Sequence, residues 1–246
     1  MIKLSLYGIR EWLGCGIIAI LLIAIAMYLA ITFKYYVTGW IFSGFVVLVW
    51  LCIAAFFRDP PRTIPGDPDI LVSPADGVVR DIGLVDCPEI KCFEDGKSRR
   101  IGIFLSVLNV HLNRAPCRMR IEYEMYKKGC FHDARDGRAS KENESMTIGG
   151  IGDMDGYNFP VAVKQISGAI ARRIVCPVRI GQLLEKGRIF GMIKFGSRTE
   201  LYLPDSDDFE ILVKEGDKVY AGSTPIARFK LPPDEESPRN EEQNIK

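Results

Sequence analysis

The sequence predicts an α+β protein in which a β-dominated domain follows an N-terminal hairpin of two hydrophobic helices. Three observations lead to this prediction. Two long runs without charge follow each other near the N-terminus, a proline-rich segment comes next, and short β-branched runs separated by glycine fill most of the rest. With 246 residues, the chain is long enough for one substantial domain and an appendage.

The first element is a membrane anchor at residues 1–57. Residues 12–33 and residues 35–57 contain no charged side chain, and only Lys34 lies between them. As a helix, each run is long enough to cross a hydrocarbon core of about 30 Å. A signal peptide fits poorly, because a second hydrophobic run follows the first almost at once. Two alternatives to a spanning hairpin stay open: a buried helical pair in a soluble core, and a re-entrant or monotopic hairpin.

Basic residues flank the hairpin at both of its outer ends. Lys3 and Arg10 lie near the start of the first run, and Arg58 and Arg62 follow the second. The positive-inside rule then places both ends of the hairpin in the cytoplasm. We expect the chain in the plasma or inner membrane, with its folded domain on the cytoplasmic face.

Net charge and cysteine spacing limit the possible partners. The formal net charge is only +1, so the chain as a whole does not attract nucleic acid, which is not an expected partner. Seven cysteines are scattered without paired CxxC spacing. Metal knuckles need such spacing, so we expect no metal site and predict reduced thiols, in agreement with a cytoplasmic domain.

A proline-rich linker follows at residues 58–69. Its four prolines cannot continue a helix or supply a central strand, so we predict a stiff connector that holds the next domain close to the membrane. The domain itself covers residues 70–230. Residues 231–246 are rich in Pro, Glu and Asn and predict a disordered tail.

The sequence pattern at residues 70–230 predicts a mainly β domain. The long helices that crossovers in a parallel sheet require are missing, and short helices are expected only near residues 131–143 and 106–112. Expected strands include residues 71–72, 77–79, 101–105, 161–163, 189–193, 200–203 and 211–213.

Two glycine pairs indicate tight hairpins, because glycine accepts the positive φ of such corners. The pairs are Gly181 with Gly187 and Gly216 with Gly222. Together with Ser-Pro-Ala-Asp-Gly at residues 73–77, these hairpins resemble those of lipoyl or biotinyl carriers. This gives an alternative function, a non-enzymatic membrane-anchored adaptor with a carrier-like β domain. A true carrier would need an exposed lysine at a hairpin tip, and Lys186 and Lys218 are the candidates.

Three side chains from distant segments provide the parts of an activated hydroxyl. Ser197 supplies a nucleophile, His111 a base and Asp76 a carboxylate that orients the base. The chain has only one other histidine, His132, which lies in a predicted turn. Taken alone, His111 and Asp76 fit ordinary structural roles, and the combination is what indicates chemistry.

The motifs around these residues resemble one known family, the short form of the phosphatidylserine decarboxylases, which also includes archaetidylserine decarboxylases. The matching stretches run in order along the chain: Phe-Arg-Asp-Pro at residues 57–60, Ser-Pro-Ala-Asp-Gly at 73–77, Asn-Val-His-Leu-Asn-Arg-Ala-Pro at 109–116, Lys-Glu-Asn-Glu at 141–144, Gly-Ala-Ile-Ala-Arg-Arg-Ile at 168–174 and Phe-Gly-Ser-Arg at 195–198.

The resemblance implies a self-processing enzyme. Ser197 attacks the carbonyl of Gly196, His111 takes its proton and Asp76 orients the imidazole, which leaves a covalently bound pyruvoyl group at residue 197. Fragments 1–196 and 197–246 remain associated. The pyruvoyl group forms a Schiff base with phosphatidylserine, and decarboxylation gives phosphatidylethanolamine, with His111 serving again as a proton donor.

The resemblance leaves the substrate contacts and the assembly less defined. Arg114 and Arg198 are candidates for binding the phosphate or carboxylate of the lipid, because guanidinium groups bind both bidentately. Structural ion pairs are an equally good interpretation of these two arginines. A homo-oligomer is expected, and diacyl and archaeal ether lipids both stay open as substrates.

Overall fold

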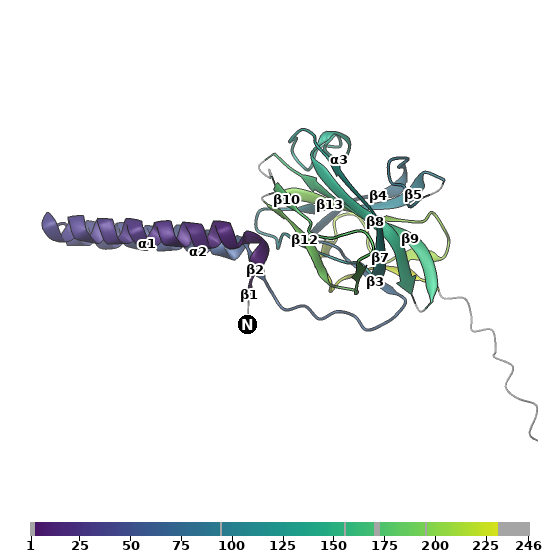
Figure 1. Ribbon diagram of the computed structural model, residues 1–246, viewed down its shortest axis with the longest axis horizontal. Helices are drawn as coiled ribbons and strands as arrows, with labels where there is room; N and C mark the ends of the chain where they lie inside the picture. Colours follow the sequence, from purple (N-terminus) through teal and green to yellow (C-terminus); the bar gives the residue numbers. More distant parts are fainter. Residues whose placement is uncertain (1–2, 94, 155, 170–172, 195, 231–246) are drawn as a thin grey trace, which may run out of the picture.

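The computed structural model describes residues 3–93, 95–154, 156–169, 173–194 and 196–230. Two long helices lie side by side and project from one side of a β domain (Figure 1). The arrangement confirms a β-dominated fold that follows an N-terminal pair of apolar helices. The predicted disordered tail at residues 231–246 lies outside the described residues.

The helical pair consists of α1 (Ile9–Thr32) and α2 (Tyr36–Phe56), and a short 3₁₀ helix, η1 (Leu6–Gly8), precedes it. Both long helices have the length and composition to cross a membrane. In the most apolar 18-residue stretch of each helix, only 11% is buried in the first helix and 28% in the second. The pair is therefore not the core of the β domain, and the buried-pair alternative is wrong.

The base of the helical pair is attached to the β domain at several points. The short strands β1 (Lys3–Leu4) and β2 (Arg58–Asp59) pair antiparallel, so the segments before α1 and after α2 form one ribbon. Lys194 makes an ion pair with Glu11 in the first turn of α1. The ribbon joins the two ends of the hairpin, and the ion pair attaches the start of α1 to β12 of the domain.

An eight-stranded antiparallel sheet forms most of the domain. Its order is β11-β7-β8-β9-β13-β5-β4-β15. The strands are β4 (Gly77–Asp86), β5 (Lys97–Leu105), β7 (Arg118–Lys127), β8 (Ser145–Met154), β9 (Tyr157–Ser167), β11 (Leu183–Leu184), β13 (Ser197–Leu203) and β15 (Lys218–Val219).

Two three-stranded sheets and one short helix complete the domain. One sheet has the order β10-β12-β6, the other the order β14-β16-β3. The elements are β3 (Ile70–Val72), β6 (Leu112–Arg114), β10 (Arg173–Val175), β12 (Ile189–Lys194), β14 (Phe209–Ile211), β16 (Pro225–Phe229) and α3 (Ala139–Glu142).

Strand β13 lies at the centre of the large sheet. It pairs with β9 on one side and β5 on the other, and all seven of its residues are buried. The main apolar core includes Leu201 and Leu203 of β13 together with Ile101, Ile103 and Leu105 of β5. Strand β13 is thus held by hydrogen bonds along both edges and by core packing.

The structure corrects several expected elements. Residues 106–109 form a turn and not the expected helix. The strand expected at residues 211–213 lies instead at Phe209–Ile211, which is β14. Strands β7 and β8 were not expected, because charge interrupts the first and glycine the second. At Gly150 a Cβ atom would lie 2.0 Å from the Arg120 carbonyl oxygen, so this glycine permits the close approach of the two strands.

The four glycines that predicted hairpin corners all have positive φ, between 75° and 92°. The turns at Gly181, Gly187, Gly216 and Gly222 are therefore confirmed. The turns alone do not establish that these hairpins resemble those of lipoyl carriers. This resemblance stays a prediction.

Candidate active site

Ser197 is the first residue of β13 and is fully buried. Its strand neighbours are Leu105 of β5 and Ser167 of β9. Within the described part of the chain, its hydroxyl has no hydrogen-bond partner. A buried hydroxyl without a partner costs free energy, so its presence here calls for a functional explanation.

The peptide before Ser197 is held in an unusual way. Gly196 has φ +59°, a conformation that L side chains rarely adopt. Its carbonyl oxygen lies so close to Gly168 that a Cβ atom on Gly168 would be only 2.3 Å away. Two glycines therefore define the position of the carbonyl that the Ser197 hydroxyl would attack.

His111 is fully buried in the turn that leads into β6. Its Nδ1 atom lies 3.0 Å from the Asn109 carbonyl oxygen. A carbonyl oxygen only accepts, so Nδ1 carries the hydrogen and Nε2 presents a lone pair. Nε2 has no partner among the described residues. The ring is therefore set up as a neutral base with a free acceptor nitrogen.

The electrostatic surroundings keep this imidazole neutral. Burial lowers the pKa of His111 to about 4, the hydrogen bond to Asn109 opposes the shift, and the positive charge of Arg58 adds to it. The ring also packs against Phe56 at the end of α2, with ring centroids 4.4 Å apart. His111 thus lies where the helical pair meets the domain.

Two local contacts fix the position of His111. The Ser106 backbone N–H and hydroxyl both donate to the Asn109 side-chain oxygen, at 2.8 and 2.7 Å, which stabilises the turn before the histidine. The Ile193 backbone N–H donates to the His111 carbonyl oxygen at 3.1 Å. Ile193 precedes Ser197 by only four residues, which span at most about 14 Å. The fold therefore brings the histidine segment and the serine segment together.

Asp76 makes no hydrogen bond with His111. Both of its carboxylate oxygens accept hydrogen bonds from Arg62 of the linker, at 2.9 and 2.7 Å. The Ala221 backbone N–H donates to the same carboxylate at 2.8 Å. The expected hydrogen bond to the imidazole is absent, because Arg62 occupies the carboxylate and Asn109 occupies the imidazole N–H.

Arg114 and Arg198 are both engaged in internal ion pairs. Arg114 binds Asp59 at 2.8 Å. Arg198 binds both Asp81 and Glu200 at 2.7 Å and is only 7% exposed. Arg198 also follows Ser197 on a strand, so their side chains point to opposite faces of the sheet. The structural interpretation of Arg198 is therefore the better supported one.

Asn113 is a buried residue whose role the sequence alone did not reveal. Its side-chain NH₂ donates to the Thr199 hydroxyl at 2.9 Å and to the Pro74 carbonyl at 3.3 Å. Its side-chain oxygen accepts a hydrogen bond from Gln165 at 2.8 Å. Asn113 therefore joins β13, β9 and the loop before Asp76. The sequence signal that could have identified Asn113 is its position in the motif at residues 109–116, which also contains His111.

Asn143 supports the strand beside Ser197. Its side chain donates to the carbonyl oxygens of Ser167 and His132, each at 2.8 Å. Since Ser167 pairs directly with Ser197, this contact fixes the neighbour of the candidate nucleophile. His132 itself is partly exposed and lies 2.9 Å from Glu142, which agrees with its predicted structural role.

Burial makes three of the cysteines poor nucleophiles. All seven are free. Burial raises the pKa of Cys92 and Cys117 to about 12 and that of Cys176 to about 11, so these thiols stay protonated. Within the described residues, no group of three or more His, Cys, Asp or Glu side chains is close enough to hold a metal ion.

Comparison with known proteins gives consistent matches. The family model described as phosphatidylserine decarboxylase matches residues 50–227. A phosphatidylserine decarboxylase proenzyme of Carboxydothermus hydrogenoformans is 45% identical over 75% of this chain and 83% of its own length. The proteins of the same name from Wolbachia sp. subsp. Brugia malayi and Rhodopirellula baltica are 44% and 42% identical, each over 78% of this chain and over 81% and 79% of their own lengths.

Proposed function

The chain belongs to the phosphatidylserine decarboxylase family, and we propose that it converts phosphatidylserine into phosphatidylethanolamine and CO₂ with a pyruvoyl group made from its own Ser197. One observation carries the proposal. The Ser197 hydroxyl and the His111 Nε2 atom are both buried without a partner among the described residues, in segments that the fold joins. The relatives are named proenzymes, which agrees with a processing step.

The proposed self-cleavage begins with the Ser197 hydroxyl. Its oxygen attacks the carbonyl carbon of Gly196, and its proton passes to His111 Nε2. The Ser197 amide nitrogen leaves that carbon and takes up a proton, so an ester now joins the two residues. Loss of the Cα proton of residue 197 breaks the Cβ–O bond and frees the Gly196 carboxylate. Tautomerisation and hydrolysis of the resulting dehydroalanine release ammonia and leave the pyruvoyl group.

The site fits the formation of such a group. Gly168 leaves space around the Gly196 carbonyl, and the complete burial of Ser197 keeps bulk water away from the ester. Once formed, the pyruvoyl group supplies a carbonyl that condenses with the substrate amine and accepts the electron pair released with CO₂. A separately acquired cofactor is then unnecessary.

His111 is proposed as the proton carrier in both reactions. Its lowered pKa keeps it neutral at physiological pH, so it begins as a proton acceptor. After it has taken a proton, the ring is an acid that readily returns it to a carbanion. The structure has no hydrogen bond between His111 and Ser197, and catalytic hydrogen bonds commonly tighten only along the reaction.

Asp76 is proposed as a positioning residue. In this structure it holds Arg62 of the linker and the backbone of Ala221. Direct orientation of His111 by Asp76 would require the Arg62 ion pair to open. Asp76 would otherwise act indirectly, by attaching the linker to the loop that Asn113 also binds.

The proposed fragments 1–196 and 197–246 would remain associated. Strand β13 starts at Ser197 and belongs to the smaller fragment, whereas its neighbours β5 and β9 belong to the larger one. The cut would thus leave a central strand of the sheet paired along both edges. A homo-oligomer of the processed units stays a prediction.

The position of the site supports a lipid substrate at a membrane surface. Leu108 is 84% exposed and Val107 is 48% exposed in the turn that precedes His111. Arg58, two residues beyond α2, donates to the Leu108 carbonyl oxygen at 2.5 Å. An exposed apolar turn is therefore attached directly to the base of the helical pair, where a bilayer surface would lie.

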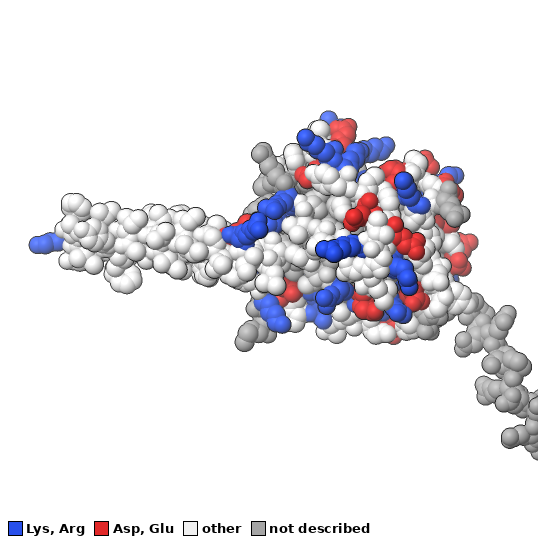
Figure 2. Space-filling view, in the orientation of Figure 1, with Lys and Arg blue, Asp and Glu red and all other residues white. Residues whose placement is uncertain are grey.

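Charge placement supports the proposed orientation. The helical pair shows almost no charge along its length, while basic side chains gather at its base (Figure 2). We propose that both helices span the plasma or inner membrane and hold the domain on the cytoplasmic face. Arg114 and Arg198 could bind the lipid only by exchanging their present carboxylate partners.

The alternative function, a carrier-like adaptor, has less support. Lys186 donates to the carbonyl oxygens of Asp67 and Ile70, at 2.6 and 3.4 Å, and so is not a freely presented lysine. An adaptor would also have no use for a buried serine hydroxyl without a partner. Lys218, in the short strand β15, is the other candidate for such a role.

The test compares the wild-type chain with the Ser197→Ala variant. The denatured mass should show two fragments that meet between residues 196 and 197, with a pyruvoyl N-terminus on the smaller one, whereas the variant should stay intact. The wild type should release CO₂ from phosphatidylserine in vesicles, and the variant should not. A wild-type chain that is active while uncut would contradict the mechanism.

A further inference from the structure

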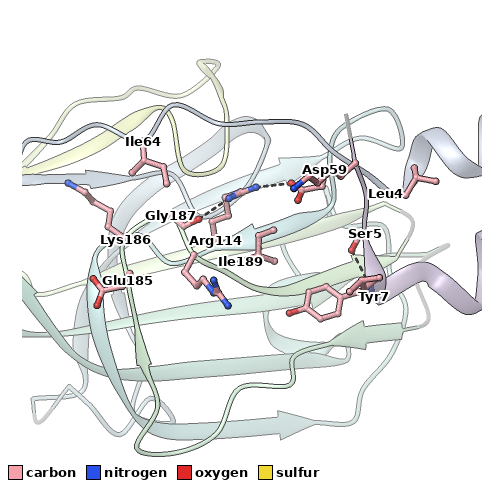
Figure 3. A pocket seen from close by; sticks show the side chains of 13 residues that line it. Leu4, Ser5, Tyr7, Asp59, Ile64, Arg114, Glu185, Lys186, Gly187 and Ile189 are labelled. Atoms are coloured by element: carbon pink, nitrogen blue, oxygen red, sulfur yellow. Dashed lines mark hydrogen bonds and ion pairs between the residues drawn. The ribbon is translucent and has the colours of Figure 1, made fainter. Parts of the chain in front are cut away.

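A pocket lies at the base of the helical pair, and we call it the hairpin-base pocket. It encloses about 600 Å³. Its walls come from residues 3–7 before α1, from Asp59 and Ile64 of the linker, from Arg114 of β6 and from the turn at residues 185–189 (Figure 3). The hairpin, the linker and the domain thus all contribute to its walls.

This pocket is separate from the candidate active site. Strands β6 and β12 run antiparallel, and Arg114 pairs with Ile189 at the end that borders the pocket. At the other end, Ile193 binds the backbone of His111. Four residues of strand separate the two ends, which corresponds to about 13 Å. A phosphate bound in the pocket would therefore lie well away from the backbone that carries His111.

The lining carries more positive than negative charge. Its charged residues are Lys3, Asp59, Arg114, Glu185, Lys186 and Arg188. Both carboxylates already have partners: Asp59 binds Arg114 at 2.8 Å, and Glu185 binds Arg118 outside the pocket at 3.6 Å. The negative charges of the lining are therefore not available to neutralise the remaining cations.

Two cations of the pocket have no partner in the described part of the chain. Neither the Lys3 nor the Arg188 side chain makes an ion pair or hydrogen bond there. Lys186 donates only to backbone carbonyl oxygens, so its charge is not neutralised. An anion with several acceptor oxygens would satisfy these groups, and guanidinium suits phosphate in particular.

Much of the rest of the lining is apolar and lies close to the start of the first hydrophobic helix. Leu4, Leu6, Ile64 and Ile189 contribute apolar surface. Leu6 is 76% exposed and is the first residue of η1, directly before α1. Cations beside apolar side chains at this level match the phosphate and the upper acyl chain of a phospholipid.

We propose that the hairpin-base pocket binds the phosphodiester headgroup of an anionic phospholipid that is not the reacting substrate. The bound lipid would fasten the base of the hairpin to the domain, because the pocket walls come from both. The proposal rests on the membrane position proposed above. It does not depend on self-cleavage or decarboxylation.

The test uses the full chain in detergent and phosphatidylglycerol, an anionic lipid without an amine or carboxylate to react. Bound lipid is counted by native mass spectrometry during a titration. Arg188→Glu should weaken phosphatidylglycerol binding about tenfold or more, because it reverses one charge near the phosphate. Arg188→Gln should have a smaller effect. Arg179→Glu, an exposed arginine outside the pocket, should bind as the wild type does.

Two further probes identify the ligand. Diacylglycerol lacks the phosphate, and inorganic phosphate lacks the chains, so both should bind more weakly than phosphatidylglycerol. Equal binding by the wild type and both Arg188 variants, or equal loss in Arg179→Glu, would overturn the proposal. Inorganic phosphate binding as tightly as the lipid would show a free-phosphate site and overturn the lipid assignment. Failure of Ser197 processing would leave all these results unchanged.

Discussion

Gly168 lies against the carbonyl oxygen of Gly196 so closely that a Cβ atom on Gly168 would be 2.3 Å from that oxygen. The two residues are far apart in sequence, and only the end of β9 and the start of β13 bring them together. The contact determines where the carbonyl before Ser197 is held.

Gly168→Ala should slow self-cleavage while the domain still folds. The added methyl group must displace the Gly196 carbonyl, and a displacement near 1 Å can cost about a hundredfold in rate. The measurement is the fraction of cut chain against time, by denatured mass. Gly137→Ala is the matched control, because a Cβ atom there meets nothing within 4 Å. Equal cleavage rates in the two variants would show that the close approach has no role.

His111→Gln should slow self-cleavage by about 10²–10⁴-fold, the usual contribution of a positioned proton acceptor. Glutamine keeps a similar size but provides no basic nitrogen. The cleavage rate, measured by the appearance of the smaller fragment, should change little in His132→Gln, because His132 is partly exposed and binds Glu142. If both histidine variants cleave at the wild-type rate, another group takes the proton.

The stability of the folded chain should fall as the pH is lowered from about 6.5 towards 4. Burial lowers the pKa of His111 to about 4, so in this window the unfolded chain binds more protons than the folded one. The full effect below pH 4 is about 3 kcal/mol. Thermal unfolding of wild type and His111→Gln in detergent should show a steeper loss in the wild type. Parallel curves would mean that His111 is not buried as a neutral base.

Asn113→Ala should destabilise the domain by about 2–4 kcal/mol, because it leaves the buried Gln165 and Thr199 side chains without this partner. It should also reduce cleavage, since the loop at Pro74 is no longer tied to β13. Thermal unfolding and denatured mass report the two effects. Asn158→Ala, at an exposed position, is the control. An unchanged melting temperature would contradict the bridging role.

Leu108→Ser should impair decarboxylation of phosphatidylserine in vesicles several-fold, through a higher apparent KM, because less apolar surface enters the lipid. Activity on a short-chain, water-soluble phosphatidylserine should stay unchanged. Leu84→Ser removes a leucine that is 54% exposed on β4, and it should affect neither assay. Equal loss on both substrates would place the effect of Leu108 on the histidine turn and not on the bilayer.

The sequence alone determined the elements that depend on local pattern. Two uncharged runs predicted the helical pair, since the absence of charge over a membrane thickness is visible in any single stretch. Glycine spacing predicted the corners at Gly181, Gly187, Gly216 and Gly222, because positive φ is a property of one residue. The ordered motifs indicated the family and the candidate residues Ser197 and His111.

Only the tertiary structure decided which groups meet. Asp76 binds Arg62 and not His111, because the folded linker passes over the carboxylate. The Asn109 carbonyl oxygen accepts a hydrogen bond from His111 Nδ1 and so determines which ring nitrogen carries the hydrogen. Gly168 approaches Gly196 because β9 pairs with β13. Such contacts depend on strand register and loop path over the whole chain. Sequence patterns report covalent neighbours and periodicity, and they carry little information about which distant segments lie side by side.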